Sequence, residues 1–205
     1  MRSQAERPQE RFSLIRAFLR DLDDLVARPA PTPDTVQSVK NRLADLIRQS
    51  PTLPDPVKLS SASCYSRHLL YADPEGRYEI VVMVWGPGQS TPIHDHAGIW
   101  CVEGVVEGVI DVTRYDLVKM VGTAARMQTT EVIHAGLGQC GALIPPVEYH
   151  KISNPYERPA FTMHVYGGQM RSCRIFTQRD DGDYDISDKE LGFSSPRPAL
   201  APLPS

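Results

Sequence analysis

The sequence predicts a mainly β protein, a small antiparallel barrel with α-helices packed outside it. Two observations lead to this prediction. Near residue 60, apolar side chains at helical spacing give way to short β-rich runs separated by Gly and Pro. The chain also has 205 residues, of which 41% are hydrophobic and 23% charged, a balance that suits one domain with a substantial core.

Two helices are expected within the first 58 residues. Apolar side chains recur every three or four residues over 9–27 and again over 34–49. The second stretch starts at a Thr-Pro-Asp sequence, which favours a helix N-terminus, and the Pro-rich stretch 50–56 ends it. Both helices therefore precede the β-rich region.

Five β-rich runs follow, each bounded by turn residues: 78–85, 99–115, 130–136, 142–146 and 160–167. Short strands at this spacing predict an antiparallel sandwich or barrel. The final SSPRPALAPLPS predicts a disordered or surface-following tail. We therefore expect a single domain composed of an N-terminal helical segment, a barrel core and a Pro-rich tail, with the bounds 1–58, 59–193 and 194–205.

Charge and composition exclude several classes of function. The net charge is −3, from 22 basic and 25 acidic residues without runs of one sign, which excludes a nucleic-acid binder that relies on bulk electrostatics. No apolar run reaches the roughly 18 residues of a membrane span, and the start lacks the apolar core of a signal peptide. The four cysteines lie far apart, without a CxxC, so neither a disulfide framework nor a zinc knuckle is indicated. We expect a cytoplasmic protein without nucleic-acid or membrane partners.

Three histidines form a candidate metal site. His94 and His96 lie two residues apart in a strand-like segment, so both side chains point to the same face. His150 follows a Pro-Pro turn and could complete the site from another strand. Three neutral imidazoles leave a divalent ion with its full charge and with open positions on one face. Such a set suits Fe(II), although Zn, Ni and Mn bind similar ligands.

The surroundings of these histidines resemble the two sequence motifs of the cupin superfamily. The first motif is matched in spacing by Gly88, His94, His96 and Gly108, with Cys101 at the position of its acidic ligand. The second is matched by Pro145, His150 and Asn154, with Val147 in place of the usual Gly. The resemblance implies a cupin-type, jelly-roll-like barrel that binds a metal ion.

Residues 60–170 resemble, more narrowly, the type I cysteine dioxygenases among the thiol dioxygenases. The segment CYSRHLL, residues 64–70, is similar to the family's Tyr-x-Arg segment, and the run WGPGQSTPIHDH ends at the first two histidines. The resemblance implies one mononuclear Fe(II) per chain and the oxidation of L-cysteine by O2 to cysteine sulfinate. Its partners would be a small thiol substrate and O2.

The resemblance also implies the roles of individual residues. The iron ligands would be His94, His96 and His150. Arg67, with Tyr65 beside it, would hold the substrate carboxylate. Residue chemistry independently supports the role of Arg67, because a planar guanidinium can clamp a carboxylate at two points.

Three further residues resemble the family's Ser-His-Tyr relay: Thr162, His164 and Tyr166. Their spacing of two residues places them on one face of a strand, where a hydroxyl–imidazole–phenol chain could form. In some members of the family, a cysteine at the position of Cys101 forms a thioether with the active-site tyrosine. A crosslink between Cys101 and Tyr166 is therefore a hypothesis for this chain.

The sequence also departs from the crosslinked cysteine dioxygenases. Gly167 and Gly168 stand where those enzymes tend to have Ser-Pro-Pro, and this pair looks more like the branch that oxidises 3-mercaptopropionate. That branch usually has Gln at the position of Arg67, so Arg67 favours L-cysteine. The alternatives are a 3-mercaptopropionate dioxygenase and a non-catalytic cupin that binds a small ligand. Asp95 and His68 are expected to point away from the site.

Overall fold

The structure, a computed structural model, describes residues 12–27, 32–146, 149–195 and 197–203. The predicted mainly β barrel with helices outside it is confirmed. The expected first turn of the helix over 9–27 and the motif residue Val147 lie outside the described residues. The helical elements are α2 (Ser13–Val26), α3 (Pro33–Arg48) and a short 3-10 helix (Asp55–Lys58).

Eleven strands make up the rest of the described fold. They are β1 (Ser66–Ala72), β2 (Glu79–Trp85), β3 (Ile93–His94), β4 (Cys101–Glu107), β5 (Val109–Val121), β6 (Ala124–Gly136), β7 (Cys140–Leu143), β8 (Tyr149–Ser153), β9 (Ala160–Tyr166), β10 (Ser172–Gln178) and β11 (Tyr184–Glu190). One five-stranded sheet has the order β1-β2-β9-β4-β7, and the other strands close a ring in the order β10-β11-β6-β5-β8-β3. None of the described helices combines the length and the apolar character needed to span a membrane.

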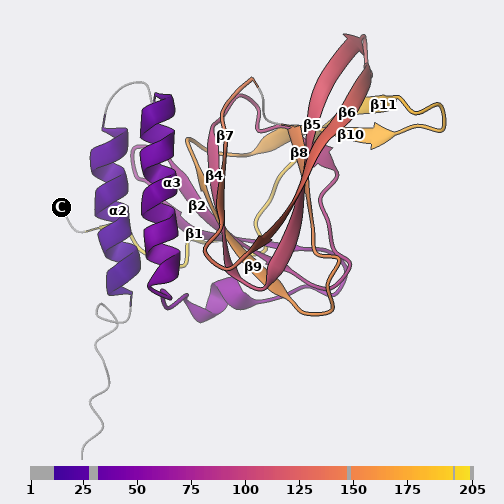
Figure 1. Cartoon of the computed structure of the whole chain (residues 1–205). Helices are drawn as coiled ribbons and strands as arrows, with labels where there is room; N and C mark the ends of the chain where they lie inside the picture. The colour runs from indigo at the N-terminus through magenta and orange to yellow at the C-terminus, as the bar shows by residue number, and fades with distance from the viewer. Residues whose placement is uncertain (1–11, 28–31, 147–148, 196, 204–205) are drawn as a thin grey trace, which may run out of the picture.

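The two helices cover one face of the five-stranded sheet (Figure 1). Each buries a stripe of apolar side chains three or four residues apart, such as Ile15, Leu19 and Leu22 of α2. At the start of α3, the Thr32 side chain accepts a hydrogen bond from the backbone N–H of Thr35, which caps the helix. The opposite face of the sheet is left to the barrel interior.

Alternation along the central strands separates these two environments. On β2, Ile80 and Val82 belong to the helix-side core, whereas Val81, Met83 and Trp85 point into the barrel. Both faces are buried, which explains why this strand is an almost continuous apolar run. On β2, β4 and β9, every second residue therefore faces the barrel interior, where the candidate site lies, and the residues between them face the helices.

The run expected over 99–115 is not one strand but two, β4 and β5. They meet at Gly108, which has a φ of +77°. A Cβ at Gly108 would also lie 2.7 Å from the carbonyl oxygen of Pro159, so only glycine fits this turn. Glycine is therefore required at the end of the first motif both by the backbone conformation and by the close approach of Pro159, a residue distant in the sequence.

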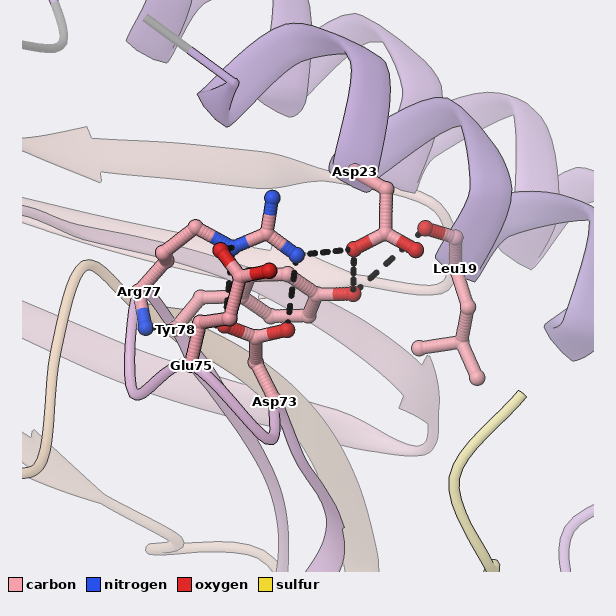
Figure 2. A network of polar contacts seen from close by, with 6 residues as sticks. All are labelled: Leu19, Asp23, Asp73, Glu75, Arg77 and Tyr78. Atoms are coloured by element: carbon pink, nitrogen blue, oxygen red, sulfur yellow. Dashed lines mark hydrogen bonds and ion pairs between the residues drawn. The ribbon is translucent and has the colours of Figure 1, made fainter. Parts of the chain in front are cut away.

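A polar network fastens α2 to the turn between β1 and β2 (Figure 2). Arg77 donates hydrogen bonds of 2.8 Å to the buried carboxylate of Asp73 and to Asp23 of α2. The Tyr78 hydroxyl donates to the same Asp23 oxygen at 3.0 Å. Hydrogen bonds from Arg77 lower the pKa of the Asp73 carboxyl, so this carboxylate stays charged where the helix docks.

The described part of the tail follows β1 along the edge of the sheet. Backbone N–H groups of Ser194, Ala199 and Leu200 donate to carbonyl oxygens of β1 at 2.7–2.9 Å. The Leu200 side chain is buried in the helix-side core. The tail therefore follows the surface, one of the two outcomes expected for it.

Candidate metal centre

Three histidines meet inside the barrel. His94 ends β3, His96 follows it, and His150 lies on β8 directly across from His94 in the strand register. One ring nitrogen of each lies within 4.8 Å of those of the other two. The Nε2 atoms of His94 and His150 are 3.2 Å apart. The structure therefore brings together the three side chains that the spacing suggested.

Burial favours the neutral form of two of these rings, those of His94 and His150. Burial lowers the pKa of His94 to about 4 and that of His150 well below its ordinary value. The Nδ1 of His94 lies 3.1 Å from the carbonyl oxygen of Pro92, which fixes the proton there and leaves Nε2 free to act as a ligand. The three converging imidazoles fit a divalent transition metal ion.

Arg67 lies on the barrel face of β1, beside the metal centre. Its Nη1 donates to the carbonyl oxygen of Gly192 at 3.0 Å, and the guanidinium lies 5.2 Å from the ring centroid of Phe193. Arg67 is only 7% exposed, yet its Nη2 makes no hydrogen bond of good geometry with any described residue. A buried guanidinium nitrogen without a partner is suited to an anionic ligand.

One pocket is lined by Arg67 and by two of the three converging histidines, His94 and His150. Tyr65 lies at its wall and stacks on Trp85 with ring centroids 4.9 Å apart. The lining residues are Tyr65, Arg67, Met83, Thr91, Pro92, His94, His150, Ile152, His164, Tyr166, Met170, Cys173, Ile175, Lys189 and Leu191. No Asp or Glu is among these lining residues. The pocket is therefore cationic and otherwise mostly apolar.

Thr162, His164 and Tyr166 point from β9 into the barrel. The Thr162 hydroxyl accepts a hydrogen bond from the Trp85 indole at 2.9 Å and lies 2.7 Å from Nε2 of His164. The Tyr166 ring stacks on His164, with centroids 5.9 Å apart, and burial raises its pKa despite the neighbouring Arg67. The hydroxyl–imidazole part of the chain is hydrogen-bonded, whereas the phenol meets the imidazole through its ring face.

Cys101 and Tyr166 are direct cross-strand partners on β4 and β9. Cys101 is fully buried and Tyr166 is 5% exposed. Directly opposed residues of an antiparallel pair have Cβ atoms about 4.5–5.5 Å apart and project to the same face. The geometry is thus compatible with the hypothesised crosslink.

Glu103 is a site residue that the sequence analysis missed. It lies on β4, two residues after Cys101, and is 6% exposed. Its oxygens lie 3.7 Å from Nδ1 of His150 and 3.4 Å from Nδ1 of His164, and burial raises its pKa to about 7. The available signal was strand alternation, because a Glu at the same parity as Cys101 has to face the barrel interior.

Two nearby residues do point away, as expected. Both Asp95 oxygens are hydrogen-bonded to Arg174, with distances of 2.6 Å to its Nε and 2.9 Å to its backbone nitrogen. The His68 ring lies 2.7 Å from the carbonyl oxygen of Leu59 and 3.1 Å from the Ser195 hydroxyl. Both side chains thus tie separate segments to the barrel.

Comparison with known proteins agrees with this geometry. A family model described as "Cysteine dioxygenase type I" matches residues 19–179. The chain is 26% identical to cysteine dioxygenase type 1 of Danio rerio over 117 residues, which are 56% of this chain and 57% of that protein. It is 23% identical to the Rattus norvegicus protein of the same name over 116 residues, 56% of each chain. The chain thus spans little more than half the length of these curated relatives.

Among solved structures, the chain is similar to an uncharacterized conserved protein with a double-stranded β-helix domain from Klebsiella pneumoniae. The identity is 18% and the TM-score 0.45, over 57% of this chain and 88% of that chain. The family model, by contrast, covers well over half of the sequence and includes the three histidines, Arg67 and the relay residues. It ends before the pocket-lining Lys189 and Leu191 and before the segment that supports Arg67. On this match, the chain belongs to the cysteine dioxygenase type I family of the cupin superfamily.

Proposed function

We propose that this protein is a non-haem Fe(II) thiol dioxygenase that converts L-cysteine and O2 to cysteine sulfinate. The metal would be held by His94, His96 and His150, one ion per chain. The observation that carries the proposal is the buried Nη2 of Arg67, which makes no hydrogen bond of good geometry with a described residue and lines one pocket with His94 and His150. A thiol that also carries a carboxylate can engage both features at once.

The iron, when bound, would favour the thiolate form of the substrate and bring it together with O2. Arg67 would bind the substrate carboxylate, aided by Tyr65 at the pocket wall. Its position is fixed by the hydrogen bond to Gly192 and by the Phe193 ring, so little ordering remains to be done when substrate binds. Both atoms of O2 enter the product, so the thiol RSH becomes the sulfinic acid RSO2H without another co-reactant.

Tyr166 would donate a hydrogen bond to the reacting oxygen or to the substrate carboxylate. Burial keeps its phenol protonated, which makes it a donor at neutral pH. Thr162 and His164 would set its position, since the imidazole that stacks on the phenol is itself held by the Thr162 hydroxyl. Bulk water is largely excluded, because all three side chains are at most 5% exposed.

3-Mercaptopropionate is the second candidate substrate. The described pocket lining offers no carboxylate to pair with the amine of cysteine, so that amine would have to bind the metal. The Gly167-Gly168 pair resembles the enzymes that oxidise 3-mercaptopropionate, but the packing around Gly167 explains the glycine there. A Cβ at Gly167 would lie 2.0 Å from the Trp100 ring nitrogen, so glycine is needed there whatever the substrate.

A Cys101–Tyr166 thioether is a further part of the proposal. The S–C bond would replace the thiol S–H and one ring C–H, with O2 accepting the two hydrogens. Peptide mass spectrometry should then detect a linked pair about 2 Da lighter than the two separate peptides, because two hydrogens are lost. Cys101→Ser is the matched control, and full recovery of both unlinked peptides after turnover would count against the crosslink.

Oxygen uptake tests the main proposal. Protein loaded anaerobically with Fe(II) is given L-cysteine or 3-mercaptopropionate, and the sulfinate product is quantified beside a metal-stripped sample. One cysteine sulfinate per O2, lost on stripping and restored by Fe(II), is the expected result. Faster turnover of 3-mercaptopropionate would select the second substrate. No uptake with either thiol by iron-loaded protein would leave the non-catalytic binding role.

A further inference from the structure

A buried carboxylate lies directly behind the metal centre. Glu103 projects from β4 into the barrel, where its Cα register partner on β9 is His164. The two carboxylate oxygens face different rings. Oε1 lies 3.7 Å from Nδ1 of His150, and Oε2 lies 3.4 Å from Nδ1 of His164. One side chain thus spans a metal-ligand candidate and the histidine of the relay.

The remaining contacts determine which atoms of the two rings face Glu103. Nε2 of His150 points toward His94 at 3.2 Å, so Nδ1 is the nitrogen turned away from the metal position. The Thr162 hydroxyl already accepts from Trp85 and can donate its own hydrogen to Nε2 of His164. A neutral His164 then carries its proton on Nδ1, which faces Oε2 of Glu103 at 3.4 Å.

Packing alone does not impose this orientation. Glu103 also borders a second cavity of about 280 Å³, whose lining includes Lys40 and Arg114. The carboxylate could turn toward these cations, yet its oxygens face the two imidazoles. Both Nδ1 atoms and Oε2 of Glu103 are fully buried, and none of the three has a hydrogen-bond partner among the described residues.

We propose that Glu103 is a positioning residue whose carboxylate orients the rings of His150 and His164 by facing Nδ1 of each, at 3.7 and 3.4 Å. This inference rests on the proposed function, in that a metal ion binds to the three histidines. A carboxylate behind a ligating imidazole fixes the ring and increases its basicity, and losing such a partner typically weakens metal binding by about 10- to 100-fold. The same carboxylate would keep His164 aligned beneath Tyr166.

The test compares Fe(II) affinity among three variants of the full chain. Glu103→Gln preserves shape without the carboxylate, and Glu103→Leu removes both acceptors. Asp73→Asn is the matched control, because Asp73 is another buried carboxylate that is 5% exposed but is bonded to Arg77 at the helix-docking turn. Affinity is measured by anaerobic competition with a chromophoric chelator, and apo-protein thermal unfolding is recorded for each variant.

Both Glu103 variants should bind Fe(II) about 10- to 100-fold more weakly than wild type, whereas Asp73→Asn should bind within about twofold of it. The visible spectrum of the Co(II)-loaded protein should change only in the Glu103 variants, since the His150 ring is no longer held. If Glu103→Leu fails to fold, the near-isosteric Gln variant decides the question.

Two results would overturn the inference. The first is wild-type affinity and an unchanged Co(II) spectrum in Glu103→Gln. The second is a wild-type stoichiometry of two ions that falls to one in the variant, because Glu103 would then itself be a ligand, with Cys101 and His164 as its nearby donors. A wild-type protein that binds no Fe(II) would instead contradict the proposed function.

Discussion

Replacing Arg67 by Met, which has no hydrogen-bond donor, should selectively impair thiols that carry a carboxylate. The guanidinium is 7% exposed, so solvent screens its charge only weakly, and Nη1 is already bonded to Gly192. That leaves mainly Nη2 for the substrate, and a hydrogen bond between charged groups is worth about 1.5–3 kcal/mol. The loss of about 2–3 kcal/mol corresponds to a decrease in kcat/KM of about 30- to 150-fold.

Oxygen uptake with three thiols measures this effect against an internal control. L-cysteine and 3-mercaptopropionate both have a carboxylate, whereas cysteamine has the thiol and amine without it. Arg67→Met should lower kcat/KM for the first two and change that for cysteamine by less than about threefold, on the same hydrogen-bond reasoning. An equal loss for all three would mean that Arg67 supports the fold or the metal rather than the carboxylate. An unchanged kcat/KM for cysteine would refute the reasoning outright.

Three further predictions concern packing and charge. Gly167→Ala should destabilise the protein by about 1–3 kcal/mol in urea unfolding, because its methyl would overlap the Trp100 ring. Arg77→Ala should cost about 2–3 kcal/mol at pH 7, since it leaves the buried Asp73 carboxylate without its cation. Arg77 lowers the native pKa of the Asp73 carboxyl, so this ion pair stabilises the fold above the unfolded pKa of about 3.9, and the stabilisation is lost at lower pH. The loss of unfolding free energy caused by Arg77→Ala should therefore become smaller below about pH 4. Phe193→Ala should raise KM for L-cysteine by about two- to fivefold in oxygen-uptake assays, because the cation–π support of the guanidinium is lost.

Each of these predictions has its own control or refuting outcome. Gly136→Ala is the packing control, since its Cβ would meet nothing closer than 3.8 Å, and equal stability of both glycine variants would contradict the overlap argument. For Arg77→Ala, a cost that stays constant from pH 7 to pH 3 would show that Asp73 is not its main partner. For Phe193→Ala, a parallel rise in KM for cysteamine would indicate a general opening of the pocket.

Local patterns predicted the parts of the site that depend on short-range geometry. The two-residue spacing of His94 and His96, and that of Thr162 and His164, fixes each pair to one face of the chain, and the structure retains both arrangements. The prediction of one β-rich run over 99–115 missed the break between β4 and β5 at Gly108. Glycine is needed there partly because of the carbonyl oxygen of Pro159, which is distant in the sequence. A contact of that kind leaves no periodic signal in the sequence.

Long-range partners explain the rest of what the sequence left out. Glu103 looks like one polar residue in an apolar run, and its importance comes from the register that places β4 beside β9. Gly192 and Phe193 follow a strand that was not predicted, and no local pattern connects them with Arg67. Metal-ligand candidates can be identified from their residue type and spacing, whereas the supporting residues can be identified only from their contacts with residues distant in the sequence.

The support of Arg67 by Gly192 also has a consequence for the order in which the pocket is made on the ribosome. The two residues are separated by 125 positions, whereas all three metal-ligand candidates are synthesised before Gly192 emerges. A nascent or prematurely terminated chain that ends after His150 has every imidazole of the centre but no backing for the guanidinium. The carboxylate-binding side of the pocket can therefore be completed only after Gly192 has been synthesised, later than all three metal-ligand candidates.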